Sequence, residues 1–231
     1  MSKPDSFYWY LLNHAGTNFL CKFMVFYMVA ILVGVLLAFS PNVQAAGFLP
    51  SNAIKYRREL TRLAHAEWGL NAPIPVFAAQ IHQESTWNPA AVSAVGAQGM
   101  AQFMPDTAKW LCESSGTAAS QCLPQNPVWS MRALMQYDKW LYARVWGLND
   151  YDRMWATLRA YNGGLGWWQR EALMAPAKRM ATREEIDSFC GKNRRHVMHC
   201  KENLAYPHRI MNIYQPRYSG WGRIIIQGGQ A

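Results

Sequence analysis

Charged residues are scarce in this sequence. They make up 16% of the 231 residues, whereas hydrophobic residues make up 51%. This balance excludes an intrinsically disordered chain, which has few apolar residues and many charges. The sequence also lacks a glycine repeat, sustained heptads and an internal period, which excludes collagen-like, coiled-coil and solenoid architectures. The length fits one domain of ordinary size, or two small ones, together with a tail.

Acidic residues are few: 14 Asp and Glu oppose 23 Lys and Arg, giving a formal net charge of +9. Residues 1–46 hold two basic residues and one acidic residue, so residues 47–231 carry +8. A basic domain favours an anionic partner, such as nucleic acid, anionic lipid or an acidic cell-wall polymer. The basic residues are scattered, with neither an RRM-type motif nor zinc-finger spacing. We therefore expect no nucleic-acid partner.

One stretch alone is long and apolar enough to span a bilayer. Residues 23–39 (FMVFYMVAILVGVLLAF) contain no charge and follow Lys22. Their length is at the lower limit for a spanning helix and slightly long for a secretory signal. The small residues VQAAG follow, so we expect cleavage after Ala45 or Ala46, with an uncleaved membrane anchor as the alternative. Either way residues 47–231 are exported, and we expect a periplasmic protein, free or anchored in the inner membrane.

Cysteine is also rare, with five residues in all. Cys21 borders the apolar run, which leaves four cysteines in the exported region. An oxidising compartment favours disulfides. We expect the bonds Cys112–Cys122 and Cys190–Cys200, because each closes one short loop and would contribute about 2–3 kcal/mol.

A zinc site is the alternative for the second cysteine pair. Its ligands would be Cys190, His196, His199 and Cys200. Structural zinc sites favour C-x2-4-C and H-x3-5-H spacings, which the adjacent His199 and Cys200 fit poorly. We therefore expect neither a metal nor another cofactor.

Helical periodicity dominates residues 47–231, which read as one compact all-α or lysozyme-like domain. Asp106 and Asp150 are expected as helix N-caps. A strand pattern is weak and confined to Arg223–Gln227, and residues 175–201 are expected to be rich in loops. The expected helices cover residues 52–68, 75–84, 106–112, 126–146, 150–161, 166–173 and 202–214.

Glu84 lies at the end of a predicted helix whose other side is apolar at residues 76–78. A carboxyl at the rim of such a helix loses hydration, which raises its pKa. A general acid working near neutral pH needs such a pKa. Polar residues near the chain breaks, Ser85, Gln102 and Asn162, suit hydrogen bonds to hydroxyl and acetamido groups. An isolated glutamate here would be read as an ordinary surface residue at a helix end.

Four segments together resemble the catalytic domain of the soluble lytic transglycosylase (SLT) family, which is related in fold to goose-type lysozyme. The family pattern is Glu-Ser, a stretch like N-P-x-A-x-S-x-x-G-A-x-G-L-M-Q-L-M-P, then A-Y-N-A-G, then E-T-x-x-Y. The matching segments are Glu84-Ser85 and residues 88–105, 160–164 and 202–206. Gly163 and Asn203 replace the alanine and the threonine of the pattern. The resemblance covers roughly residues 76–215 and is specific because four motifs occur in the right order.

The resemblance implies cleavage of the bond between N-acetylmuramic acid (MurNAc) and N-acetylglucosamine (GlcNAc) in peptidoglycan, with Glu84 as the single catalytic residue. As an acid, Glu84 would protonate the glycosidic oxygen. As a base, it would then deprotonate the muramoyl C6 hydroxyl, which attacks C1 and closes a 1,6-anhydro ring. Assistance from the substrate acetamido group would explain why a second catalytic carboxylate is not needed.

The resemblance also implies substrate-binding or orienting roles for Ser85, Gln102, Tyr161, Asn162 and Tyr206. Gln102 and Asn162 would bind sugar. Tyr206 would hydrogen-bond the catalytic carboxyl and orient it. Ser85 would contact the substrate near the cleaved bond, and Tyr161 would shape the cleft.

Two other functions stay open at this point. One is a hydrolytic lysozyme, in which Asp106, Asp150 or Asp152 would position a water. The other is a membrane-anchored wall-binding module without catalysis. The biological setting is equally open among wall recycling, phage lysis, and the opening of local gaps for a secretion or conjugation machine.

Overall fold

The computed structural model describes residues 49–192 and 197–228. These residues belong to the compact unit Gly47–Ala231. The predicted signal or anchor at residues 23–39 and its cleavage site lie outside the described residues. Within the described ranges, no helix combines the length and the hydropathy required to cross a bilayer.

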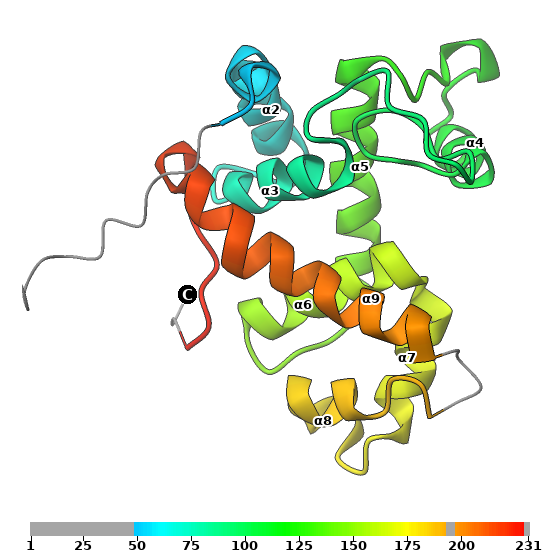
Figure 1. Ribbon diagram of the computed structural model, residues 1–231, viewed down its shortest axis with the longest axis vertical. Coiled ribbons are helices and arrows are strands. Elements are labelled where there is room, and N and C mark those ends of the chain that lie inside the picture. The colour runs from blue at the N-terminus through cyan, green and yellow to red at the C-terminus, as the bar shows by residue number, and fades with distance from the viewer. Residues whose placement is uncertain (1–48, 193–196, 229–231) are drawn as a thin grey trace, which may run out of the picture. The chain divides into compact units, whose positions relative to one another are not determined.

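The described chain is built from helices (Figure 1), and its two described ranges contain isolated β-bridges but no regular strand. The mainly α prediction is therefore confirmed. The α-helices are α2 (Ser51–Trp68), α3 (Ile74–Ser85), α4 (Pro105–Ser114), α5 (Pro127–Tyr142), α6 (Asp150–Gly163), α7 (Leu165–Met174), α8 (Arg183–Ser188) and α9 (Val197–His208). The remaining segments are the 3-10 turns η1 (Ala119–Gln121), η2 (Lys178–Met180) and η4 (Gln215–Trp221), and the π-helical η3 (Arg209–Tyr214).

Helix α3 runs through the core, and every residue from 74 to 81 is buried. Its sequence is apolar around most of its circumference, which is typical of a helix enclosed by others. Pro75 occupies the first turn, where its missing N–H breaks no helical hydrogen bond. Helix α2 and the C-terminal segments η3 and η4 pack against α3. Thr86, with φ of 51°, ends the helix, so Glu84 lies in its last turn, where the side chains change from buried to half-buried.

Two predicted helix caps are wrong by one or two positions. Asp106 and Asp150 lie in the first turns of α4 and α6 and are not N-caps. Asn149 caps α6, because its side chain accepts a hydrogen bond from the backbone N–H of Asp152 at 2.9 Å. An acidic residue in a first turn still stabilises the helix, since the N-terminal end carries partial positive charge.

Two boundaries and one strand also differ from expectation. Helix α5 ends at Tyr142, and the loop-rich stretch 175–201 holds α8 and the start of α9. Residues 223–227 do not form a strand. Instead, the buried side chain of Gln215 donates to the Ile225 carbonyl and accepts from its N–H, both at 2.8 Å. A side-chain amide thus takes the place of a neighbouring strand.

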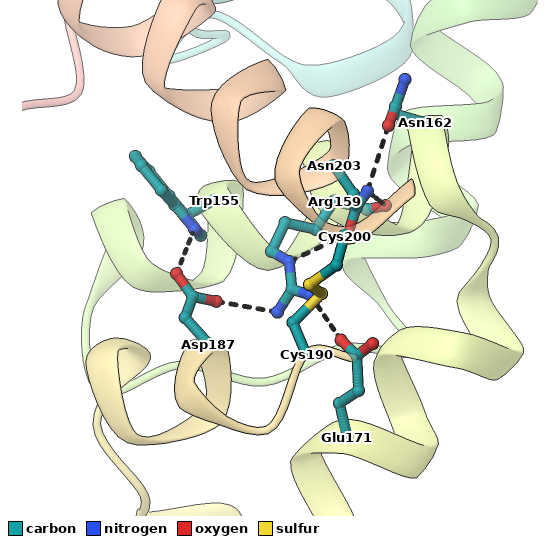
Figure 2. The surroundings of a disulfide bond; sticks show 8 residues. All are labelled: Trp155, Arg159, Asn162, Glu171, Asp187, Cys190, Cys200 and Asn203. Carbon is teal, nitrogen blue, oxygen red and sulfur yellow. Dashed lines mark hydrogen bonds and ion pairs between the residues drawn. A yellow bond between two sulfur atoms is a disulfide. The ribbon is translucent and has the colours of Figure 1, made fainter. Parts of the chain in front are cut away.

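The structure has the disulfides Cys112–Cys122 and Cys190–Cys200. The first joins α4 to the segment before α5, and the second joins the chain after α8 to the first turn of α9 (Figure 2). Cysteines bonded to each other supply no thiolate to a metal, which argues against the zinc alternative. Of its remaining ligands, His196 lies outside the described residues.

A fully buried arginine lies beside the second disulfide (Figure 2). The guanidinium of Arg159, on α6, donates to Asp187 of α8 at 2.7 Å and pairs with the buried Glu171 of α7. Its Nε donates to Asn203 of α9 at 3.1 Å. One side chain therefore links four helices. A buried charge is tolerated when it is paired in this way, because desolvating an unpaired ion costs several kcal/mol.

Arg159→Leu should lower the free energy of unfolding by about 3–5 kcal/mol, because it removes the cation that faces buried carboxylates. Glu171→Leu should also destabilise the protein. The double variant Arg159→Leu/Glu171→Leu should lose less than the two single changes together, since both charges leave the core at once. Urea unfolding of the three variants measures this coupling, and strictly additive losses would contradict it.

The loop between α3 and α4, residues 86–104, approaches the chain before α5 at Gly99. This residue has φ of +77°, and a Cβ placed on it would lie 1.8 Å from the carbonyl oxygen of Pro124. A backbone atom cannot rotate out of the way. Gly96, in the same loop, also has positive φ, at +87°, but no atom lies within 4 Å of its Cβ position.

The two glycines form a matched pair for mutation. Gly96→Ala should cost about 1–2 kcal/mol, the strain of a left-handed backbone with a side chain. Gly99→Ala should cost clearly more, because it adds a clash to the same strain. Thermal and urea unfolding compare the two proteins, and equal losses would show that the loop moves away from Pro124 freely.

Candidate functional site

The site is formed where the end of α3 meets α9. Glu84 is half-buried in the last turn of α3. Tyr206 is buried on α9, and its hydroxyl donates a hydrogen bond to Oε1 of Glu84 across 122 residues of sequence. The contact between these two side chains is the one that the resemblance implied.

Burial raises the pKa of the Glu84 carboxyl to about 7, because loss of hydration disfavours the charged form. The hydrogen bond from Tyr206 lowers the pKa and partly opposes this effect. The negative charge of Glu202 raises it, and the positive charge of Arg209 lowers it. A carboxyl with a pKa near 7 holds its proton about half of the time at neutral pH, so it can both donate and accept one.

The loop 86–104 is fixed to the helices on both sides. The hydroxyl of Ser85 donates to the Met100 carbonyl at 2.9 Å. The hydroxyl of Ser130 on α5 accepts from the Ala101 N–H at 3.0 Å. Ser85 therefore anchors the loop to α3. Its hydroxyl oxygen keeps its lone pairs, with which it would accept a hydrogen bond from a ligand.

Gln102 also holds this loop. Its backbone is left-handed, with φ of 48°. Its side-chain nitrogen donates to the carbonyls of Gly99 at 2.9 Å and Ala91 at 3.3 Å. With the amide nitrogen engaged inside the loop, the carbonyl oxygen is the atom that Gln102 would offer to a sugar hydroxyl.

Tyr161 and Asn162 come from the end of α6. The Tyr161 hydroxyl donates to the Ala101 carbonyl at 2.7 Å, and its ring is parallel to that of Tyr206, with centroids 6.4 Å apart. Asn162 is exposed. Its Oδ1 accepts from Asn203 at 3.2 Å, and its Nδ2 points away from Asn203 (Figure 2). Asn162 thus presents its N–H donors outward.

These contacts connect most of the predicted residues, whereas Asn162 is held separately through Asn203. Tyr206 contacts both Glu84 and Tyr161, and Tyr161 binds the carbonyl next to Gln102. The sequence did not reveal how Asn162 is oriented. Asn203 orients Asn162: the Oδ1 of Asn203 accepts a hydrogen bond from the Arg159 guanidinium, and its Nδ2 donates one to Asn162. The sequence offered one signal for this role, which is that Asn203 stands where the family pattern has threonine.

A second buried carboxyl near the site was also missed. Asp138 on α5 is completely buried, and the charge of Glu84 affects its protonation. It follows Leu134 by one turn and precedes Leu141 on the core side of its helix. The signal for it was an acid placed at a position where the helical period expects an apolar residue.

Comparison with known proteins places the chain in a family. The family described as the Transglycosylase SLT domain matches residues 63–182, just over half of the chain. The matched range includes Glu84 and Asn162 and ends before Tyr206.

Curated relatives share part of their length with the chain. A Shewanella denitrificans protein named membrane-bound lytic murein transglycosylase F is 27% identical over 197 residues, covering 76% of this chain and 37% of the relative. A protein of the same name from Mannheimia succiniciproducens is 36% identical over 92 residues, covering 39% of this chain and 17% of the relative. The chain therefore spans well under half the length of these relatives.

Solved structures show the same fold. The lytic transglycosylase Slt of Pseudomonas aeruginosa, solved as an inactive mutant, matches with a TM-score of 0.57 and 21% identity, covering 76% of this chain and 26% of that one. The 70 kDa soluble lytic transglycosylase of Escherichia coli matches with a TM-score of 0.52 and 21% identity, covering 72% and 24%. The lysozyme-like fold expected from the sequence is confirmed. Together with the family match, this shows that the chain belongs to the Transglycosylase SLT domain family.

Proposed function

We propose that this protein is a peptidoglycan lytic transglycosylase that cleaves the β-1,4 bond between MurNAc and GlcNAc. The observation that carries the proposal is the Glu84 carboxyl, whose pKa of about 7 results from burial and whose orientation is fixed by the Tyr206 hydroxyl. Membership of the SLT family and the names of the relatives support the same reaction class.

In the proposed reaction Glu84 acts twice. Its proton passes to the glycosidic oxygen while the bond from that oxygen to C1 of MurNAc breaks, with help from the substrate acetamido group. GlcNAc leaves with a 4-hydroxyl. The C6 hydroxyl of the same MurNAc then attacks C1 and gives its proton to Glu84, which forms the 1,6-anhydro ring and restores the starting acid. Water is neither consumed nor released.

The surroundings favour this route over a lysozyme that uses water, which would need a second carboxylate in the cleft. Asp150 pairs with Arg223 at 3.2 Å. Asp152 lies 3.7 Å from Arg183, and Asp106 is exposed in the first turn of α4. Each of these three candidates for positioning a water already has a helix-terminal or ion-pair role.

The sugar contacts follow from the polar atoms that the loops leave unused. Asn162 would donate to a substrate carbonyl such as that of an acetamido group, and Gln102 would accept from a hydroxyl. Ser85 would accept a hydrogen bond near the cleaved bond, and Tyr161 would form part of the cleft wall. Ser85, Gln102 and Tyr161 are held by backbone carbonyls and Asn162 by the side chain of Asn203, so each would meet the substrate already oriented.

The setting that we infer is the periplasm. The charge of +8 on residues 47–231 would attract the anionic wall. Residues 23–39 would serve as an export signal or an inner-membrane anchor, and the named relatives are membrane-bound. A secretion or conjugation machine that needs a local gap in the wall would be a fitting partner.

Purified residues 47–231 should release anhydro-muropeptides from peptidoglycan, lighter by one water than hydrolytic products. Glu84→Gln keeps the shape of the side chain but has no proton to give, so the rate should fall by at least about 10²-fold. Mass analysis of the released fragments tests both points. Hydrated reducing ends would mean a lysozyme, and release of the same product at the same rate by the variant would remove Glu84 from the mechanism.

The rate should fall by about tenfold per pH unit above pH 7, because Glu84 must begin the reaction protonated. The Tyr206 hydrogen bond stabilises the ionised form and lowers the pKa. Tyr206→Phe should therefore raise the pKa of Glu84 and move the alkaline limb of kcat/KM to higher pH. Tyr161→Phe is the matched control, since its hydroxyl binds a backbone carbonyl, and it should leave the limb in place. A shift in the control alone, or in neither variant, would contradict this assignment.

A further inference from the structure

Two fully buried polar side chains face each other between α3 and α5. Gln80 and Asp138 have no exposed surface. The Gln80 amide nitrogen donates to Oδ1 of Asp138 at 3.4 Å. The other polar atoms of the same two groups, Oε1 of Gln80 and Oδ2 of Asp138, are buried and have no hydrogen-bond partner in the described part of the chain.

A single proton accounts for both of these oxygens. An amide oxygen and an ionised carboxylate oxygen only accept hydrogen bonds, so they cannot satisfy each other. If Asp138 is protonated on Oδ2, that atom becomes a donor, and Oε1 of Gln80 is the buried acceptor on the facing side chain that has no other partner. The planar carboxamide and the planar carboxylic acid then share two hydrogen bonds side by side. Buried polar atoms are almost always paired in native proteins, which favours the protonated form.

The charges around Asp138 also favour its protonated form. Five side chains interact with Asp138 strongly enough to affect a pKa. They are Gln80 and Glu84 on α3, Tyr137 on α5, Tyr161 on α6 and Tyr206 on α9. None of them is a cation. Burial holds the pKa of Asp138 well above its usual range, the Gln80 hydrogen bond lowers it, and the charge of Glu84 raises it. Of the two carboxyls, half-buried Glu84 therefore loses its proton first.

We propose that Asp138 is a positioning residue of the site, which stays a neutral carboxylic acid paired with Gln80 while Glu84 gives and takes its proton. The role rests on the proposed function, because it acts through Glu84. Gln80 lies one helical turn before Glu84, so the pair fixes α3 against α5 immediately before the turn that carries Glu84. Because Asp138 in this pair is neutral, it adds no second negative charge near the Glu84 carboxyl. Asp138 has no exposed surface with which to touch substrate, so it is not a catalytic residue.

The protonation state can be measured without activity. Carbon-13 NMR of protein labelled at the side-chain carboxyls of Asp and Glu follows each group from about pH 5, where ordinary carboxyls are already mostly ionised, to about pH 8, where they are fully ionised. The signal missing in Asp138→Asn identifies Asp138. It should stay at the protonated position throughout, while the Glu84 signal, assigned with Glu84→Gln, moves near pH 7. A signal for Asp138 at the ionised position would overturn the proposal, whether or not the protein cleaves peptidoglycan.

Asp138→Asn provides the second test, because an asparagine reproduces the neutral acid: its Nδ2 donates to Gln80 and its Oδ1 accepts. If Asp138 is neutral, the alkaline limb of kcat/KM keeps its midpoint. If Asp138 is ionised, the variant removes a negative charge beside Glu84, and the midpoint moves to lower pH, which would overturn the proposal. Should this variant fail to fold, the wild-type spectrum still tests the proposal, because a spectrum in which every Asp carboxyl is ionised by about pH 8 would overturn it without any assignment.

Gln80→Leu tests positioning. It removes both polar atoms that face the acid, and α3 loses this polar attachment to α5 one turn before Glu84. We expect kcat to fall by about tenfold, the order expected when a reacting group is misplaced, with KM little changed. A wild-type kcat in Gln80→Leu would show that the pair has no part in positioning Glu84, even if Asp138 is neutral.

Discussion

The burial of one carboxyl at the end of a core helix is the constraint on which the rest of the site depends. Helix α3 is apolar over residues 74–81 and lies inside the protein, so its last turn carries Glu84 to the edge of the core. Partial loss of water raises the pKa of this side chain to about 7. A buried acid needs a partner that holds it in place without fixing it as an anion, and the phenol of Tyr206 is such a partner. Helix α9 and the loop 86–104 are arranged around this requirement.

The protein handles its buried polar groups in two different ways. Around Arg159 charges are paired: a guanidinium meets the carboxylates of Glu171 and Asp187. Between α3 and α5 we infer the opposite solution, in which Asp138 gives up its charge. Both avoid an isolated buried ion, which is the costly case. The ionic network links α6, which carries Asn162, to α7, α8 and α9. The neutral pair lies between α3 and α5, one helical turn before Glu84, where a second negative charge would raise the pKa of Glu84.

The sequence predicted much of the fold because helical periodicity and chain breaks are local signals. The expected helices around Glu84 and Asn162 exist, with ends displaced by a few residues, and the cysteine pairs follow from short loops in the sequence. The strand at residues 223–227 was wrong, because the partner of that segment is the side chain of Gln215. Caps were misplaced since neighbouring polar residues compete for the same N–H groups.

The four motifs already identify the reaction class to test, the acid to test it on and the family, because they carry the residue types of the chemistry in order along the chain. The sequence could not determine the pKa of Glu84, the orientation of Asn162 through Asn203, or the place of Asp138. These depend on how much water is excluded and on which groups meet across 41 to 122 residues of sequence. Desolvation and pairing arise when the helices pack against one another, so these properties follow from the folded protein and not from any local stretch of sequence.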